Sequence, residues 1–485
     1  MSPYSSQAQK CLIMAIAGSV LLLPLTLEAQ EHNDGYAAAI ATASRLSEGI
    51  VRQANLPGLS IAVGIDDQLV WHAEFGFSDL EQMVPVTPES KFRIGSVSKT
   101  LTASAIGVLV ERGQLDLDKE VDYYVPSFPK KQWPVSVRQL AGHLAGIRSY
   151  AGNEFYSTQS YESVVTPIAV FSSDALITEP GTQYQYSTYG WTVVSAAVEA
   201  AAGRPFLEFM RSDVLEPLGM VNTIADFPMQ LISNRVRFYE RDATRQLVNA
   251  PFVDVSNKWS GGGYLSTPSD LVKFGFDYQS QRHLQPETYR LLTTAQATTS
   301  GESTNYGIGW ESRPDLHGGA VLGHGGGSVG GTTAFVTWPE HSMVVAVTTN
   351  LTEDPGIFEI AFLIGELFGS STNKESAVSS GLLDMDSAAR CYKDDNPDRD
   401  LVLNLQRTGQ EITGSATGEQ SAEFGNILWG REEGGTAHVL VATSTMVRNL
   451  MISEESGVIH VNRMLSTTET PEFAGRRATC VEPEK

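Results

Sequence analysis

The spacing of apolar and polar residues divides the chain into helix-like and strand-like stretches. Three stretches predict helices, at residues 36–52, 96–111 and 355–368. The first of them is apolar on one face only, whereas the second is apolar along most of its length. Strand-like runs lie near both ends of this region, at residues 60–65, 69–75, 306–311, 332–338 and 343–349. The first two runs flank Asp66-Asp67-Gln68, and this arrangement predicts a hairpin.

The order of these elements predicts a fold class and a domain organisation. Early and late strands separated by helical insertions indicate an α/β (α+β) domain, with one antiparallel sheet built from both ends and helices packed on it. The pattern changes after a polar stretch, where β-type runs recur at residues 401–405, 427–429, 437–441 and 457–461. We therefore expect a main domain at 30–370, a linker at 371–380 and a small all-β domain at 381–485.

The first 29 residues have the features of a secretory signal peptide. Lys10 supplies a positive charge, an apolar stretch runs from Cys11 to about Leu27, and Ala29 offers a small residue for cleavage. An uncleaved anchor is the alternative, but the apolar run is short for a span of about 20 residues. We expect an exported protein, periplasmic or extracellular, with no membrane association after cleavage.

Removal of the signal peptide would leave two cysteines, Cys391 and Cys480. An even number of cysteines in an oxidising compartment favours a disulfide, which here would join the two ends of the all-β domain. Two unpaired thiols are the alternative.

The charge and the spacing of possible metal ligands exclude several classes of function. The net charge of −22, with no basic cluster, argues against nucleic acid and anionic membranes as partners. No His-x-x-x-His pair or paired Cys/His spacing occurs, so neither a metal nor a cofactor is expected.

The candidate chemistry begins at Ser96 and Lys99, which are three residues apart at the start of the second predicted helix. That spacing places an amine near a hydroxyl, and a hydroxyl is a weak nucleophile without a neighbouring base. Taken alone, the pair could be a helix-capping serine followed by a solvated lysine. Two further motifs follow in order, Tyr186-Ser187-Thr188 and His324-Gly325-Gly326, and the set favours a serine acyl-transfer enzyme.

These motifs resemble those of the serine β-lactamase-like hydrolases, relatives of penicillin-binding proteins that include class C β-lactamases, D-aminopeptidases and carboxylesterases. The Tyr-Ser-Thr variant is most similar to the LACTB-like branch. The similarity covers about residues 36–370 and implies a β-lactamase/transpeptidase-like fold with a helical subdomain. The segments that carry it are Phe92 to Lys99, Gly142 to Ile147, Tyr184 to Gly190 and Gly323 to Gly327.

The resemblance implies catalytic roles. Ser96 would be the nucleophile, Lys99 its base and electrostatic activator, and Tyr186 a proton shuttle to the leaving group. A tyrosine has a pKa of about 10, so Lys99 is expected to lower it. The backbone N–H groups of Ser96 and Gly327 would form the oxyanion hole. Which group takes the first proton stays open.

The resemblance also implies that Thr188, His324 and Gly326 bind the substrate. His324 stands where β-lactamases carry a lysine, and a histidine is largely neutral at pH 7. Thr188 replaces the usual asparagine and lacks its amide donor. Both departures favour peptides or esters over penicillin-like carboxylates.

Other local patterns have simpler explanations. The stretch 325–330 matches the nucleophile elbow G-x-S-x-G and the dinucleotide motif G-x-G-x-x-G. Both motifs require a following helix, whereas residues 332–338 predict a strand. We expect His143 to have a structural role in its loop. We interpret the stretch 260–264 first as a tight backbone passage and second as a substrate contact.

The sequence therefore predicts a serine hydrolase that forms an acyl-enzyme on Ser96. The favoured activity is that of a peptidase or amidase on small peptides, including D-amino-acid peptides. Carboxylesterase or weak β-lactamase activity is the alternative. A different class is a scaffold that holds a partner or assembles into an oligomer or filament.

Overall fold

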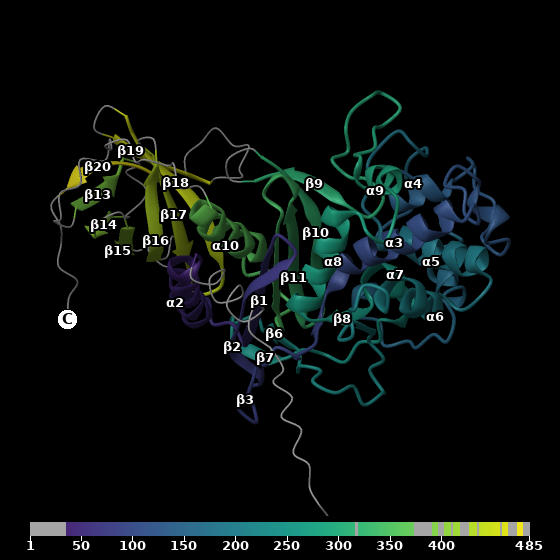
Figure 1. Cartoon of the computed structure of the whole chain (residues 1–485), viewed down its shortest axis with the longest axis horizontal. Helices are drawn as coiled ribbons and strands as arrows, with labels where there is room; N and C mark the ends of the chain where they lie inside the picture. Colours follow the sequence, from purple (N-terminus) through teal and green to yellow (C-terminus); the bar gives the residue numbers. More distant parts are fainter. Residues whose placement is uncertain are drawn as a thin grey trace, which may run out of the picture.

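The computed structural model describes residues 35–315, 319–372 and 390–395, together with 402–408, 411–417, 426–433, 436–455, 458–463 and 473–478. An α/β body and an all-β body lie at opposite ends of its long axis (Figure 1). The predicted signal peptide, most of the predicted linker and Cys480 lie outside the described residues.

The α/β body is built on an antiparallel sheet of seven strands in the order β3-β2-β1-β12-β11-β10-β9. Strand β1 from the start of the chain pairs with β12 from the end of this body, with Leu59 opposite Thr349. This pairing confirms the predicted sheet built from both ends. The strands are β1 (Gly58–Ile65), β2 (Gln68–Asp79), β3 (Val84–Pro85), β9 (Glu311–Pro314), β10 (Ala320–Ser328), β11 (Gly331–Trp338) and β12 (Met343–Thr349).

The predicted hairpin is confirmed, and one predicted strand is wrong. Asp66 and Asp67 join β1 to β2 with φ of 50° and 62°, a backbone conformation typical of tight hairpin turns. Residues 306–310 form a loop, and β9 begins only at Glu311. Gly309 has φ of 74°, which interrupts an extended strand. The loop still buries Tyr306 and Trp310, and this burial explains the strand-like pattern.

Alternating residues of the central strands face two separate cores. In β12, Val344 and Ala346 belong to the core of the helical side, whereas Val345 and Val347 pack with α2 and α10. The strand is therefore buried along its whole length because both faces of the sheet are covered. The helices are α2 (Ala37–Gln53), α3 (Ser98–Glu111), α4 (Val137–Ala141), α5 (Thr188–Ala202), α6 (Phe206–Met210), α7 (Trp259–Gly262), α8 (Pro268–Ser280), α9 (Pro286–Thr293) and α10 (Ile357–Thr372).

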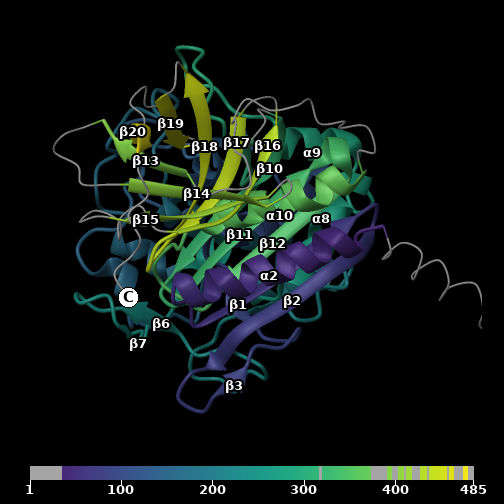
Figure 2. The ribbon, with the colours of Figure 1, turned by 90° about the vertical axis from the view of Figure 1, so that its left-hand side faces the viewer.

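The all-β body is a closed barrel of eight strands. It packs against α2 and α10, on the sheet face opposite α3 (Figure 2). Asn449 Nδ2 donates to the Glu359 carbonyl at 2.8 Å, and Val447 N–H donates to the Pro355 carbonyl at 2.7 Å. The barrel strands are β13 (Arg390–Asp394), β14 (Val402–Thr408), β15 (Glu411–Thr417), β16 (Asn426–Glu433), β17 (Thr436–Ala442), β18 (Val447–Glu455), β19 (Val458–Arg463) and β20 (Phe473–Ala478).

Two further features concern the cysteines and membranes. Cys391 lies in β13 opposite Ala478 of β20 and is disulfide-bonded. Since Cys480 lies outside the described residues, the pairing of Cys391 with Cys480 stays a prediction.

Within the described part of the chain, no helix is both long and apolar enough to cross a membrane.

Candidate active site

Ser96 lies in a short 3-10 turn, Gly95–Val97, directly before α3. Gly95 has φ of 48°, and a Cβ there would lie 2.6 Å from the backbone nitrogen and oxygen of Gly327. Only glycine fits this combination of conformation and space. The sequence predicted a helix from Ser96 onward, but the structure places this residue in the tighter turn that precedes it.

Lys99 meets Ser96 as the spacing predicted. Its Nζ lies 2.9 Å from Ser96 Oγ and donates to the Gly261 carbonyl at 2.8 Å. The lysine is fully buried, and burial holds its pKa well below the usual value, with a smaller lowering by the charge of Lys258 and an opposing effect of Glu311. A lysine with so low a pKa can be neutral and accept a proton. The Gly261 carbonyl, in the stretch predicted as a tight passage, is a contact that sequence reasoning missed.

Tyr186 also reaches Ser96, but its acidity differs from the prediction. The Tyr186 side chain is 36% exposed, but desolvation of its hydroxyl raises its pKa well above 10, outweighing a hydrogen bond with Ser96 that lowers it. The Lys99 amino group, 4.9 Å from the ring centroid, does not produce the predicted decrease. That prediction was wrong because removal of water from the phenol disfavours its charged form, and the hydrogen bond with Ser96 offsets only part of this effect. Tyr186 is therefore protonated and able to donate.

Strand β10 lies directly against the Ser96 turn. A Cβ on Gly326 would lie 1.9 Å from the Ile94 carbonyl oxygen and 3.3 Å from Ser96 N. Gly327 follows it and contacts Gly95. The two backbone segments that would form the oxyanion hole are therefore neighbours, and the role of Ser96 and Gly327 in it stays a prediction.

The Gly326→Ala substitution is expected to destabilise the fold by about 2 kcal/mol and to slow any reaction at Ser96, because the methyl group would push β10 away from the turn. Thermal unfolding and labelling by a fluorophosphonate would measure the two effects. The matched control is Gly327→Ala, whose added Cβ meets no heavy atom within 4 Å and should leave the unfolding temperature unchanged. Equal stability of both variants would contradict the prediction.

His324 is buried and neutral, with both ring nitrogens occupied. Its Nδ1 donates to the Gly325 carbonyl at 2.6 Å, and Tyr306 Oη donates to Nε2 at 2.9 Å. Burial lowers the pKa of His324 to about 4, although Glu311 opposes this effect. The predicted neutrality is confirmed. Contact between the imidazole and a substrate stays a prediction, and it would have to compete with these hydrogen bonds. The sequence did not predict that Tyr306 binds His324.

This buried histidine predicts a loss of stability in acid. The unfolded imidazole takes up a proton near pH 6.5, whereas the folded one does so only near 4, so the unfolded state binds more protons between these values. The free energy of unfolding is not reduced by this histidine above pH 6.5, and it declines by about 3 kcal/mol as the pH falls to 4. Urea unfolding across this range would measure it. We expect a shallower pH dependence in His324→Gln, and an unchanged slope would contradict the assignment.

His143 orients the Tyr186 segment, as its predicted structural role requires. Its Nδ1 accepts a hydrogen bond from the Ser187 N–H at 3.1 Å, and its ring lies 4.1 Å from that of Tyr186. Ser187 Oγ in turn accepts from Gly190 N–H at the start of α5. His143 Nε2 is buried and has no hydrogen-bond partner among the described residues. The imidazole therefore forms a wall of the site beside Tyr186.

Thr188 lies at the start of α5, two residues after Tyr186, and is nearly buried. It forms a hydrogen bond with Tyr150, whose pKa burial raises well above its usual value. Its methyl group would lie 2.8 Å from a Cβ on Gly261. The site thus joins segments that lie far apart in the sequence around Ser96.

The comparisons with known proteins agree with this geometry. A model of the family described as Beta-lactamase matches residues 42–364, about two thirds of the chain. The chain belongs to the beta-lactamase family. Human mitochondrial serine beta-lactamase-like protein LACTB is 30% identical over 399 residues, which cover 63% of this chain and 73% of LACTB. A D-aminopeptidase of Brucella anthropi is 26% identical over 383 residues, covering 76% and 68%.

Solved structures show the same fold. The octameric penicillin-binding protein homologue from Pyrococcus abyssi has a TM-score of 0.59 and 22% identity, covering 90% of this chain and 99% of the homologue. The predicted resemblance and fold class are confirmed, and this beta-lactamase-family protein is a serine hydrolase. An oligomer or filament of this chain stays a prediction.

The structure excludes the other readings of the glycine-rich stretch in this beta-lactamase-family protein. Ser328 is buried at the end of β10, and β11 rather than a helix follows it. A nucleophile elbow needs an exposed serine on a strand-to-helix turn, and a dinucleotide site needs the helix. Neither arrangement is present here.

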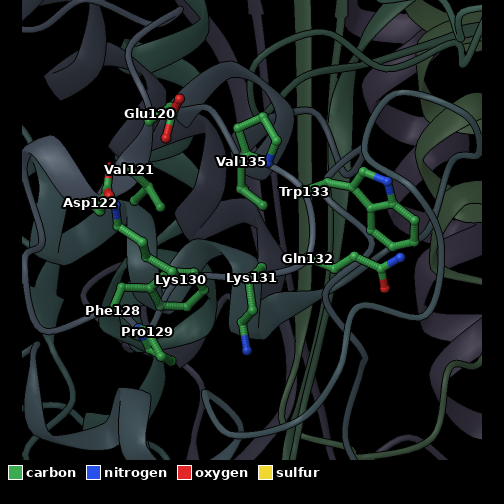
Figure 3. A pocket seen from close by; sticks show the side chains of 11 residues that line it. Glu120, Val121, Asp122, Phe128, Pro129, Lys130, Lys131, Gln132, Trp133 and Val135 are labelled. Atoms are coloured by element: carbon green, nitrogen blue, oxygen red, sulfur yellow. The ribbon is translucent and has the colours of Figure 1, made fainter.

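A separate cavity of about 240 Å³ lies in the helical part (Figure 3). Charged side chains of both signs surround it, among them Glu120, Asp122 and Lys130. None of the motif residues lines it. This cavity is therefore separate from the motif residues around Ser96, whose catalytic role stays a prediction.

Proposed function

We propose that this protein is an exported serine hydrolase that acts through an acyl-enzyme on Ser96, with small peptides or amides as substrates. The observation that carries the proposal is the contact of Lys99 with Ser96 in a fully buried position. A desolvated amine beside a hydroxyl is an activated nucleophile with its base.

The contacts support one order of proton transfers. Neutral Lys99 takes the proton of Ser96 as Oγ bonds to the carbonyl carbon of the substrate, and the N–H groups of Ser96 and Gly327 stabilise the oxyanion. The bond to the leaving group then breaks as Tyr186 gives that group its proton. The Lys99 ammonium restores the proton of Tyr186, and water later releases the acyl group. The raised pKa of Tyr186 supports its role as donor rather than first base.

The environment of His324 supports substrates that are uncharged on the leaving-group side. Tyr186 lies 6.3 Å from the His324 ring and 6.4 Å from the Tyr306 ring, measured between centroids. Since both of these side chains are neutral, they offer no permanent cation to a penicillin-like carboxylate. The D-aminopeptidase relative supports amide substrates, and the predicted signal peptide supports export.

The test combines labelling with a substrate panel. Intact-mass analysis after exposure to a fluorophosphonate should show one adduct on the folded protein. Turnover should then be compared for D- and L-alanine p-nitroanilides, p-nitrophenyl acetate and a penicillin. Faster turnover of the anilides supports the amidase proposal, and a preference for the ester would shift it to a carboxylesterase. Absence of both adduct and turnover would overturn it in favour of a scaffold.

A further inference from the structure

A second buried lysine, Lys258, lies beside the Ser96 turn. It ends the short helix Ser256–Lys258, three residues before Gly261, whose carbonyl holds Lys99. A Cβ placed on Gly262 would lie 3.9 Å from Lys258 Cδ and 3.7 Å from the backbone carbon of Gly95. The side chain of Lys258 therefore runs along the same segment that borders the nucleophile.

The amino group of Lys258 has no counter-charge among the residues that the structure describes. The residue is only 5% exposed, and its Nζ lies 5.0 Å from the centroid of the Tyr150 ring and 4.8 Å from that of Phe155. It makes one long hydrogen bond, 3.4 Å, to the Phe155 carbonyl, and no described carboxylate forms an ion pair with it. A buried ammonium group normally has a charged partner. Burial and the charge of Arg93 lower the pKa of Lys258 to about 7.

The two rings around Nζ connect Lys258 to two of the segments near Ser96. Tyr150 forms a hydrogen bond with Thr188, which follows Tyr186 by two residues. Phe155 packs in a cluster with Val329, two residues after Gly327. Lys258 thus lies between Thr188, at the start of α5, and the end of β10.

The position of Tyr186 indicates on which side of Ser96 the leaving group lies. Tyr186, the proposed donor to the leaving group, contacts the rings of His143, Tyr306 and His324. The leaving group would therefore depart on that aromatic side. Lys258 contacts none of these rings and lies beside Tyr150 and Phe155, so we place it on the acyl side.

We propose that Lys258 binds a carboxylate carried by the acyl part of the substrate. This inference rests on the proposed function of Ser96 and deepens it by naming the substrate class. A carboxylate there would supply the missing counter-charge and accept the two N–H bonds that Lys258 leaves unmade. It would also favour the protonated lysine, which burial alone disfavours. A structural role for the same lysine would require only that its stem fills the space under the two rings.

The test compares two p-nitroanilides that differ only in charge, one with a glutaryl group and one with a glutaramyl group. We expect the wild type to prefer the glutaryl compound at least tenfold in kcat/KM, and Lys258→Met to reduce that ratio to about one. The matched control is Lys119→Met, because Lys119 also lies beside a tyrosine ring, 5.8 Å from the centroid of Tyr123, but is exposed. A wild-type ratio of one or less, or an unchanged ratio in Lys258→Met, would overturn the proposal.

Three measurements keep the test decisive. Thermal unfolding shows whether Lys258→Met is folded, and the wild-type ratio tests the proposal even if it is not. If neither anilide is turned over, protection of Ser96 from a fluorophosphonate by glutaramate, which carries one carboxylate, but not by the uncharged diamide glutaramide replaces the ratio, and equal protection overturns the proposal. Absence of labelling would defeat the proposed function itself, whereas labelling without charge preference defeats only the assignment of Lys258.

Discussion

Exchange of Lys99 for methionine is expected to slow fluorophosphonate labelling of Ser96 by about 1,000-fold. Methionine has a similar length and suits a fully buried slot, so the packing of α3 should survive. What disappears is the amine 2.9 Å from Ser96 Oγ and its lone pair. Because a serine hydroxyl without a base is a weak nucleophile, the loss should appear in the rate of acylation rather than in binding.

The pH dependence of labelling separates this role from a structural one. In the wild type, the rate should rise with pH through the pKa of Lys99 and then level off, since only the neutral amine accepts a proton. The Lys99→Met variant should lose that rise. Lys119→Met, at an exposed position, should behave as the wild type. A decrease of less than tenfold with an intact pH profile would show that another group is the base.

The fold was predictable from the sequence wherever one strand or helix has an unambiguous pattern. Strands β11 and β12 are buried along their whole length and mostly apolar because both sheet faces are covered, and α3 is rich in apolar and small residues because residues 98–109 are buried. Strand β10 was harder to recognise, since its four glycines supply no side-chain pattern. In the barrel, β15 has the sequence EITGSAT, and only Ile412 is buried in the barrel core. Such polar strands obtain their stability from neighbours that are distant in sequence.

The site was predictable in its motif residues but not in its electrostatics. The three-residue spacing of Ser96 and Lys99 fixes their contact locally. By contrast, the pKa of Tyr186 depends on burial by segments more than 100 residues away, such as the loop of Tyr306. The same holds for Gly261, whose carbonyl holds Lys99, and for Lys258. A lysine or glycine in such a short helical segment gives no sequence signal of where the fold will bury it.

Exchange of Ser96 for alanine is expected to abolish the fluorophosphonate adduct and to lower turnover of any substrate by about 10,000-fold or more. The change removes one oxygen atom and leaves the turn intact, because Gly95 and Gly326 still fix the backbone. Residual turnover would come from the oxyanion donors alone, which act on the substrate carbonyl without a covalent step. Intact mass and single-turnover rates measure the two quantities separately.

The neighbouring Ser98 provides the matched control for this exchange. Its hydroxyl is also buried, but it donates to the Gly95 carbonyl at 2.7 Å and does not contact Lys99. Ser98→Ala should lose some stability and keep the adduct, because the nucleophile and its base are unchanged. An adduct that persists in Ser96→Ala and vanishes in Ser98→Ala would show that Ser98, two residues further on, is the nucleophile. Since Ser96 Oγ lies 2.9 Å from Lys99 Nζ and forms a hydrogen bond with Tyr186, the opposite pattern is the one the geometry requires.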